Sequence, residues 1–340
     1  MRALILKRGP LERKPVYHDA LLEDKPIPSL KHGEVLVKIG AAAYNHRDLW
    51  IRKGQYPGIA FDSTFGADGA GTVVASHKSN DSLLNKRVFL VPMRGWESNP
   101  DGPESKFATL GGGNIVPLGT FAQYVAVERD QVITTPEHLD DAHAAAWPLG
   151  GVTAWRAVVV NAGVKPGDNI LITGIGGGVA LTALQISVAR GANVYVSSGS
   201  EEKIQKAVAL GAKGGVNYKQ GDWASTLESL LAKNGGSEAR LSAVIDSAGG
   251  EIMSQVGKIL KHGGKVVVYG IMGSHQDLVD ATRFLAQHKI VPEVSKVLDG
   301  LESAEEGFEL IQRGQQFGKV VIKVRHDEPQ HPGSRSPSRL

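Results

Sequence analysis

The hydrophobic pattern divides the chain into a first half of short β segments and a later half in which strands alternate with helices. In the first 135 residues, runs rich in β-branched and aromatic residues are separated by clusters of Gly and Pro. These runs lie at residues 35–39, 72–75, 87–91 and 121–127. Runs of this kind are typical of strands, so this half is predicted to be a small all-β unit. The stretch 93–118 lacks periodicity and is expected to be a long surface loop.

From about residue 148 the pattern changes to buried strands with amphipathic helices between them. Short β-branched runs occur at residues 169–173, 193–197, 216–218, 243–246 and 265–269. Between them, residues 223–231 and 252–260 carry apolar side chains at helical spacing. This alternation predicts right-handed βαβ units and a doubly wound parallel sheet, so the fold class is α/β.

One strand of a complete dinucleotide-binding sheet is missing from this pattern. Such a sheet consists of two βαβαβ halves and has six strands. After the fifth run, Ser274 and Asp277 form a capping-box pattern that opens a helix through about residue 288. Residues 290–294 contain Pro292, which disfavours a central strand. We therefore expect a sheet that lacks its sixth strand.

Composition and charge exclude several classes of function. The 340 residues include no cysteine, which excludes disulfides, thiolate catalysis, thiolate zinc sites and iron–sulfur clusters. The net charge of +3 arises from 38 basic and 35 acidic residues spread along the chain, so nothing favours nucleic acid as a partner. The sequence contains neither a secretory apolar region nor an apolar run of membrane-spanning length. A soluble cytoplasmic protein without a membrane partner is the expectation.

A glycine-rich loop follows the first buried strand of the second half and precedes the apolar run 181–189. The first glycine permits a tight turn, the second lets the backbone approach a pyrophosphate, and the helix start offers free N–H groups to the anion. A valine stands at the third fingerprint position, where Gly or Ala is usual. The predicted cofactor-binding residues here are Gly174, Gly176, Gly177, Gly178 and Val179.

The end of the second strand favours NADPH over NADH. A cofactor without a 2′-phosphate is usually held there by a carboxylate on the ribose hydroxyl. Here the chain has Ser198, followed by Lys203, and hydroxyl and ammonium groups suit a phosphate. Glu201 and Glu202 are the acids that favour the opposite choice, although acids are also typical of the first turn of a helix. In the alternative interpretation Lys203 is an ordinary solvated lysine.

The order of these parts resembles the medium-chain dehydrogenase/reductase family, and the resemblance extends to about residue 324. It implies a GroES-like catalytic domain at 1–147, a Rossmann dinucleotide-binding domain at 148–288 and a return to the catalytic domain at 289–324. Residues 325–340, rich in Pro, Ser and charge, are expected to be a disordered tail. The motifs that carry the resemblance are NHRD at 45–48, GADGAG at 66–71, GTFAQY at 119–124, the glycine loop and GKVV at 318–321.

The resemblance also shows where a catalytic zinc would be held. Zinc members of the family place Cys, then His-Glu, then a second Cys at three separated positions. Those positions here hold Asn45, Ala67 with Asp68, and Leu149, and neither Ala67 nor Leu149 can bind a metal. We therefore expect no metal, and a zinc-type alcohol dehydrogenase is the less favoured reading.

The zinc-free branch, typified by quinone oxidoreductase, zeta-crystallin and enoyl reductases, is the closer resemblance. It implies that Asn45 and Asp48 organise the catalytic site and that Tyr56 hydrogen-bonds or protonates the substrate oxygen. In the structural alternatives, Asn45 holds a turn, Asp48 caps a helix and Tyr56 packs a loop. The same resemblance implies that Thr153, near the start of a helix at 153–160, contacts the nicotinamide. It also implies that Ser198, Lys203 and Tyr218 bind the 2′-phosphate.

These inferences predict hydride transfer from NADPH to a small quinone or α,β-unsaturated carbonyl compound. Without a Lewis acid, hydrogen bonds have to stabilise the negative charge that develops on oxygen, and electron-poor acceptors suit such a site.

A gap of about 25 residues relative to the family pattern follows Gly270, where the sixth strand would begin. In relatives this region forms the dimer edge and lies near the nicotinamide, so its absence puts both in doubt, and a homodimer stays a possible but doubtful assembly. It also leaves open a redox-silent relative that binds NADPH weakly or has lost turnover.

Overall fold

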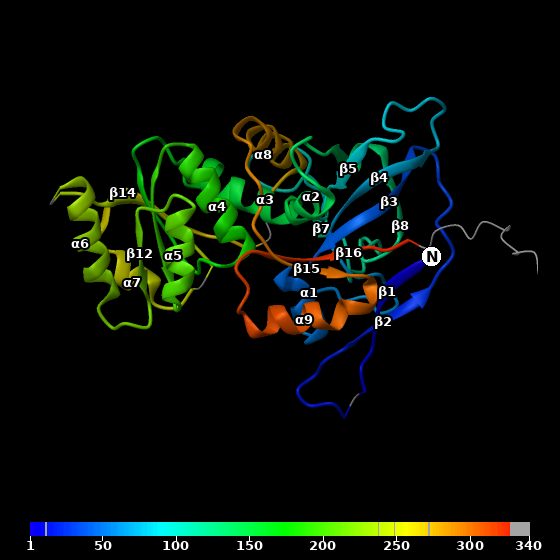
Figure 1. Cartoon of the computed structure of the whole chain (residues 1–340), viewed down its shortest axis with the longest axis horizontal. Coiled ribbons are helices and arrows are strands. Elements are labelled where there is room, and N and C mark those ends of the chain that lie inside the picture. The colour runs from blue at the N-terminus through cyan, green and yellow to red at the C-terminus, as the bar shows by residue number, and fades with distance from the viewer. Residues whose placement is uncertain (11, 237, 248, 271–272, 327–340) are drawn as a thin grey trace, which may run out of the picture.

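The computed structural model describes residues 1–10, 12–236, 238–247, 249–270 and 273–326. Within these ranges the chain forms a sheet-rich part that contains the N-terminus and a smaller α/β part beside it (Figure 1). In this part of the chain, no helix has the length and apolar character needed to cross a membrane.

The sheet-rich part is built on a seven-stranded sheet whose order is β15-β16-β3-β4-β5-β9, with β8 also paired to β3. Alternate side chains of the long strand β3, among them Val35, Val37 and Ile39, are buried, as expected for a strand with one face on a core. The strands of this sheet are β3 (Glu34–Ala43), β4 (Asp68–Ser76), β5 (Arg87–Leu90), β8 (Tyr124–Glu128), β9 (Val132–Thr134), β15 (Val294–Asp299) and β16 (Lys319–Lys323).

Shorter elements surround this sheet. Two further strand pairs are β1 (Arg2–Lys7) with β2 (Asp19–Asp24), and β6 (Met93–Arg94) with β7 (Ala108–Thr109). The helices are α1 (His46–Arg52), α2 (Asp141–Ala146) and α9 (Ala304–Arg313), with 3-10 turns η1 (Arg129–Gln131) and η3 (Leu301–Ser303). The stretch expected to be a loop thus contains the small β6–β7 pair.

The α/β part is a parallel five-stranded sheet of order β12-β11-β10-β13-β14. Its strands are β10 (Asn169–Ile172), β11 (Asn193–Ser198), β12 (Gly214–Asn217), β13 (Leu241–Asp246) and β14 (Leu260–Val268). The helices between them are α4 (Gly178–Ala189), α5 (Glu201–Ala209), α6 (Trp223–Gly235) and α7 (Ile252–Val256). The predicted α/β class is confirmed, and within the described residues the sheet ends at β14 without a sixth strand.

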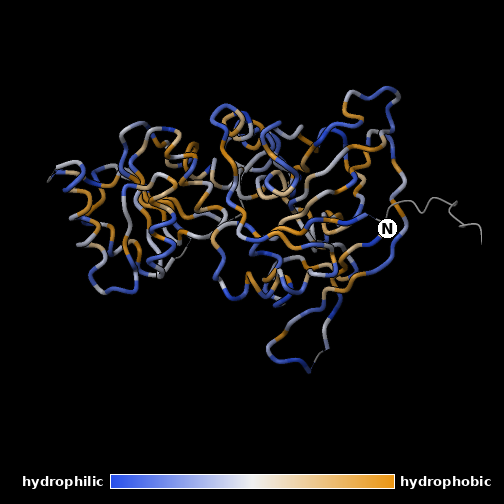
Figure 2. Tube along the Cα trace, viewed as in Figure 1, coloured by the Kyte–Doolittle hydropathy of each residue, from blue (hydrophilic) through white to orange (hydrophobic). Residues whose placement is uncertain are grey.

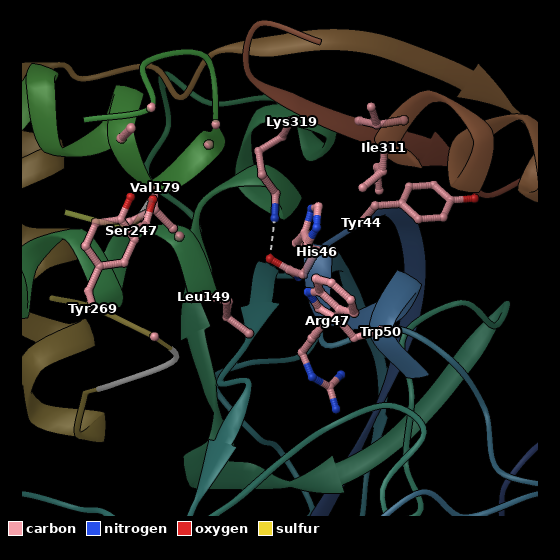
Figure 3. A pocket seen from close by; sticks show the side chains of 18 of the residues that line it. Tyr44, His46, Arg47, Trp50, Leu149, Val179, Ser247, Tyr269, Ile311 and Lys319 are labelled. Carbon is pink, nitrogen blue, oxygen red and sulfur yellow. Dashed lines mark hydrogen bonds between the residues drawn. The ribbon is translucent and has the colours of Figure 1, made fainter. Parts of the chain in front are cut away.

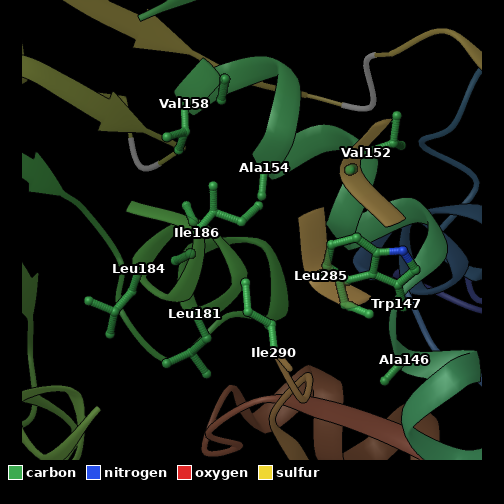
Figure 4. Close-up of a cluster of buried hydrophobic side chains, with 14 of the residues drawn as sticks. Ala146, Trp147, Val152, Ala154, Val158, Leu181, Leu184, Ile186, Leu285 and Ile290 are labelled. Atoms are coloured by element: carbon green, nitrogen blue, oxygen red, sulfur yellow. The ribbon is translucent and has the colours of Figure 1, made fainter. Parts of the chain in front are cut away.

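Two helices connect the parts. α3 (Pro148–Trp155) continues as the π-helical turn η2 (Arg156–Asn161), and α8 (His275–His288) begins at the predicted capping box of Ser274 and Asp277. The indole Nε1 of Trp147 donates a 3.0 Å hydrogen bond to the Thr282 hydroxyl of α8. Apolar side chains of α3, α4 and α8 meet in one buried cluster around this bond (Figure 4). Figure 2 shows the same segregation along the chain, with hydrophobic residues concentrated in the strands and inner helices.

Several predicted boundaries were wrong. The helix expected at residues 252–260 ends at Val256, where a turn closes with a 3.0 Å hydrogen bond from the N–H of Ile259 to the Val256 carbonyl, and Leu260 already belongs to β14. Thr153 lies inside α3, which begins five residues earlier at Pro148. The expected tail begins at Arg325, and this residue pairs with Asp299 of β15, so the start of the tail contacts the sheet-rich part. Residues 327–340 lie outside the described residues, as do Ile271 and Met272 of the turn after the gap.

Strand β16 carries the C-terminal segment back into the first sheet. It pairs antiparallel with β3, with Val321 opposite Ala43 and Lys323 opposite Ala41. Helix α9 packs against β16 and α1, and the ring of Phe308 lies 5.2 Å from the Tyr44 ring, centroid to centroid. The start of β16 is thereby fixed beside the start of α1, and this places Lys319 next to Asn45.

Candidate active site

A cavity of about 710 Å³ lies where the two parts of the chain meet. Its wall contains the glycine loop and the start of α4 on one side, and α1 with β16 on the other (Figure 3). The predicted residues Asn45 and Tyr56 line it, together with four of the five predicted glycine-loop positions. The fold therefore brings the predicted cofactor loop and part of the predicted catalytic segment to one cavity.

A buried polar network occupies the wall of this cavity. Asn45 donates a hydrogen bond of 2.9 Å from Nδ2 to Oδ2 of Asp68. The ammonium of Lys319 lies 2.6 Å from Oδ1 of Asn45 and 3.1 Å from Oδ2 of Asp68. Asp68 is fully buried, and a buried carboxylate is tolerated only when it is paired and hydrogen-bonded. Lys319 supplies the balancing charge.

The second oxygen of Asp68 accepts a hydrogen bond from a backbone group. The N–H of Leu149, at the start of α3, donates to Oδ1 of Asp68 over 2.9 Å. Asn45 and Leu149 thus both contact Asp68, although the three residues are far apart in the sequence. Because the lysine, the amide and the backbone N–H all point toward Asp68, the network fixes α1, α3 and β16 relative to one another.

Asp48 and Tyr56 belong to a second group centred on Arg47. Asp48 is fully buried, accepts a 2.8 Å hydrogen bond from the backbone N–H of Asn45, and thereby caps α1. Its burial raises the pKa of its carboxyl, which the neighbouring Arg47 opposes. The Arg47 guanidinium lies 4.8 Å from the centroid of the Tyr56 ring and donates to the carbonyls of Leu110 and Gly111. Tyr56 lines the cavity, whereas Asp48 does not.

His46 also lines the cavity, with its ring 5.5 Å from that of Trp50. Burial lowers the pKa of this histidine, and the positive charge of Lys53 lowers it further. The imidazole is therefore held in its neutral form at neutral pH. No group of three or more His, Cys, Asp or Glu residues that could hold a metal occurs within the described ranges.

The glycine loop has the backbone conformation that phosphate loops require. Gly174 has φ of +64° and Gly176 has φ of +126°, values that other residues rarely adopt. Gly177 precedes the first turn of α4, whose N–H groups are free to meet an anion. A Cβ on Gly178 would lie 2.6 Å from Cδ of Lys319, so the loop and β16 are in close contact.

The predicted 2′-phosphate residues gather only in part. Ser198 ends β11, and its hydroxyl accepts a 3.2 Å hydrogen bond from the N–H of Ser200. Beside it, a Cβ on Gly199 would lie 2.8 Å from the Tyr218 hydroxyl and 2.7 Å from Cε of Lys219. Lys203 instead turns back over the glycine loop and donates a hydrogen bond of 2.9 Å to the carbonyl of Gly314.

The two acids at the start of α5 are engaged with other groups. Glu201 accepts a 3.0 Å hydrogen bond from the side-chain amide of Asn217. Glu202 pairs with Lys206 one turn along the helix, over 2.7 Å. Thr153, predicted to contact the nicotinamide, donates to the carbonyl of Leu149 within its own helix and is not part of the cavity wall.

Sequence reasoning did not single out three cavity or cleft residues. Lys319 belongs to the GKVV motif, which carries the family resemblance and no predicted site role, and Lys219 follows the predicted Tyr218 directly. Tyr269, which burial gives a raised pKa, hydrogen-bonds Ser247 and faces the glycine loop (Figure 3). The signal for Lys319 is a charged residue directly before the apolar run VVI of the strand KVVIK.

Comparison with known families agrees with this architecture. A family profile described as the alcohol dehydrogenase GroES-like domain matches residues 31–137, and one described as a zinc-binding dehydrogenase matches residues 178–298. The chain is 41% identical to the zinc-type alcohol dehydrogenase-like protein YogA of Leptosphaeria maculans, over 94% of this chain and 99% of that protein. The chain belongs to the medium-chain dehydrogenase/reductase superfamily.

Solved structures of the superfamily have the same fold. A structure of an NAD-dependent alcohol dehydrogenase is 31% identical, has a TM-score of 0.82, and covers 96% of this chain and 100% of its own. A quinone oxidoreductase of Thermus thermophilus, solved alone and with NADPH, has a TM-score of 0.73 at 23% identity, with 95% and 100% coverage. The second likeness shows the fold alone, and the first is to an enzyme whose name states that it depends on NAD.

The three positions at which superfamily members hold a catalytic zinc do not fit a metal in this chain. The side chain of Leu149 offers no ligand atom there. Oδ1 of Asn45 already accepts a hydrogen bond from Lys319. The two carboxylate oxygens of Asp68 accept hydrogen bonds from the side chains of Asn45 and Lys319 and from the backbone N–H of Leu149. A second cation placed beside the Lys319 ammonium would be repelled by it.

A dinucleotide, by contrast, fits the residues that are present. The left-handed glycines and the free N–H groups at the start of α4 form the cradle for a pyrophosphate, and the end of β11 offers hydroxyls and a lysine. The residues that would hold it are Gly174, Gly177, Gly178, Tyr218 and Lys219.

Proposed function

We propose that this superfamily member is a zinc-independent, NADPH-dependent reductase of quinones or α,β-unsaturated carbonyl compounds. The observation that carries this proposal is the cavity wall, where the glycine loop and a buried Asn45–Asp68–Lys319 network meet. A nicotinamide cofactor supplies hydride when it is bound. The protein has to position the acceptor, exclude water and stabilise negative charge on the acceptor oxygen.

The lining of the cavity supports a flat, apolar acceptor. Trp50, Phe107, Leu149 and Ile311 contribute apolar surface, while the charged groups are few and held by partners. Quinones and enones have such shapes, and the charge that hydride transfer creates on them is delocalised. They therefore require less stabilisation than a simple alkoxide, which matches a site built from hydrogen-bond donors.

The end of β11 supports NADPH in preference to NADH. A carboxylate on the ribose hydroxyls is the usual mark of NAD use, and Glu201 and Glu202 are bonded to Asn217 and Lys206 instead. The Tyr218 hydroxyl and the Lys219 side chain lie against Gly199, where they suit a phosphate. The 31% identical structure is named as NAD-dependent, so the choice of cofactor rests on these side chains.

The test begins with fluorescence titration of the purified protein with NADPH and with NADH, using its tryptophans as donors. We expect micromolar NADPH binding and weaker NADH binding, followed by NADPH oxidation with 1,4-benzoquinone or trans-2-hexenal after treatment with EDTA. Activity that EDTA abolishes and zinc restores would show zinc-type chemistry. Folded protein that binds NADPH but oxidises it with neither acceptor would favour the redox-silent alternative.

A further inference from the structure

The ammonium of Lys319 has an unusual place for a lysine. Its side chain is 9% exposed, the next three residues of its strand are buried, and its ammonium lies 3.1 Å from the buried carboxylate of Asp68. An ammonium has three N–H bonds, and the contacts with Asn45 and Asp68 leave one of them for another acceptor. Burying a lysine is costly unless its charge is paired, and here Asp68 and Asn45 hold the ammonium in the wall of the cavity.

The cavity is the place where the remaining N–H bond can be used. Lys319 lines the cavity, and its aliphatic stem lies against Gly178 of the glycine loop. In Figure 3 its side chain points toward the side of the cavity that carries His46 and Trp50, with Leu149 nearby. The charge therefore lies between the cofactor loop and the apolar acceptor wall.

The same three positions that hold the metal ligands in zinc members surround this ammonium. Asn45 and Asp68 contact it directly, and Leu149 contacts Asp68 through its backbone N–H. We propose that the Lys319 ammonium takes the place of the metal in this chain, binding the carbonyl oxygen of the acceptor and stabilising its negative charge. This inference rests on the proposed reductase function and names the group that carries out its charge stabilisation.

The chemistry balances with the nicotinamide as the reductant. With an enone the hydride forms a new C–H bond at the β-carbon, and the displaced π electrons pass to the carbonyl oxygen as an enolate. With a quinone the hydride and its two electrons give the hydroquinone monoanion, whose negative charge lies on oxygen. Lys319 donates a hydrogen bond to that oxygen and then its proton, and water restores the ammonium. Asn45 and Asp68 hold the amine in position throughout, so they are positioning residues.

Neighbouring groups are less suited to this role. The guanidinium of Arg47 is stacked on Tyr56 and bonded to the carbonyls of Leu110 and Gly111. The lowered pKa of His46 leaves it neutral. The Tyr56 hydroxyl makes no hydrogen bond with the described residues, so it is the competing donor that the experiment has to separate from Lys319.

The experiment compares Lys319→Met, Lys319→Arg and Tyr56→Phe with Lys323→Met, an exposed lysine at the end of the same strand. Because Lys319→Met leaves the Asp68 carboxylate without its partner, the double variant Asp68→Asn/Lys319→Met serves as a charge-neutral second form. Each protein is checked by circular dichroism, by zinc content, by its NADPH Kd, and by kcat and KM with 1,4-benzoquinone and trans-2-hexenal across pH 5 to 10.

We expect kcat to fall about 100-fold or more in both forms that carry Lys319→Met, the size seen when one oxyanion donor is removed. The NADPH Kd should stay within about threefold, Lys319→Arg should recover part of kcat, and Lys323→Met should match the wild type. If the wild type is active, four outcomes would each overturn this inference and leave the proposed function standing. They are an undiminished kcat in Lys319→Met, a kcat loss confined to Tyr56→Phe, a loss of NADPH binding in Lys319→Met that parallels the loss of kcat, and one bound zinc per chain. A folded wild type that reduces neither acceptor would overturn the proposed function and this inference with it.

Discussion

Lys203 donates a 2.9 Å hydrogen bond to the carbonyl oxygen of Gly314, and this bond joins α5 to the loop that follows α9. The carbon chain of Lys203 also crosses the glycine loop, within 2.9 Å of the place a Cβ on Gly176 would occupy. Burial lowers the pKa of this lysine. Its ammonium is therefore bound to a carbonyl on the opposite side of the cleft, and among the described residues it is Lys219, which follows β12, whose side chain lies against Gly199 at the end of β11.

Lys219→Gln is predicted to weaken NADPH binding selectively. Removal of one exposed charge-assisted contact to a phosphate should raise the NADPH Kd about tenfold, which corresponds to roughly 1.4 kcal/mol, and leave the NADH Kd within about twofold. Fluorescence titration of both cofactors measures the ratio. Lys233→Gln, an exposed lysine on α6, is the control. If Lys203→Gln changed the ratio and Lys219→Gln did not, the phosphate would belong to Lys203, which then has to leave Gly314.

The glycine loop leads to a prediction about strain. Gly176→Ala should destabilise the protein by about 1–3 kcal/mol, because alanine at a φ of +126° is strained and its Cβ would collide with Lys203. Gly177→Ala is the matched variant, since Gly177 has a φ of −76° and its nearest neighbour to a Cβ lies 3.9 Å away. Urea unfolding without cofactor measures both. Equal losses of unfolding free energy in the two variants would contradict the assignment of strain to Gly176.

The order of strands and the cofactor loop could be predicted because they follow from local patterns. Short β-branched runs that alternate with amphipathic helices predicted the five parallel strands, and the capping box at Ser274 predicted the start of α8. The absence of a sixth strand from the described part of this sheet was predicted because no further β-branched run follows residues 265–269 before the helix that begins at Ser274. Strands β1, β2 and β15 were not anticipated, because their stability comes from pairing with distant segments and not from their own composition.

The buried network was not predictable in the same way. Asn45, Asp68 and Lys319 are separated by 23 and 251 residues, and only the return of β16 to β3 brings the last of them to the site. Sequence reasoning placed Asn45 and Tyr56 at the cleft, and both line the cavity. For Asp48 the structure shows the capping contact, and a catalytic role for it stays a prediction.

The exposed edge at β14 leads to a prediction about assembly. Lys261, His262 and Lys265 are exposed on this strand, and charged residues of this kind blunt an edge against pairing with another sheet. We expect a monomer of 36.1 kDa by size-exclusion chromatography with light scattering. Lys261→Val/Lys265→Val should self-associate as protein concentration rises, because it removes that protection. A wild-type dimer at micromolar concentration would contradict this expectation.

The loop that carries Trp96 and Phe107 is tied together by one carboxylate. Glu104 accepts hydrogen bonds from the backbone N–H groups of Ser98, Glu97 and Asn99, over 2.8, 2.7 and 2.6 Å. These bonds lower the pKa of Glu104 to about 2. Since Phe107 lines the cavity, the order of this loop bears on the shape of the acceptor wall.

Glu104→Gln is predicted to lower the melting temperature at pH 7, because the neutral amide accepts the three N–H groups more weakly than a carboxylate. A depressed carboxyl pKa contributes stability that is present above the ordinary value near 4.5 and is lost as the pH falls toward 2. The difference in melting temperature between wild type and variant should therefore be constant above about pH 5 and shrink between pH 4.5 and 2. Glu12→Gln, an exposed glutamate, is the control and should follow the wild type at every pH. A difference that persists unchanged to pH 2 would mean that Glu104 holds the loop through its shape and not through its charge.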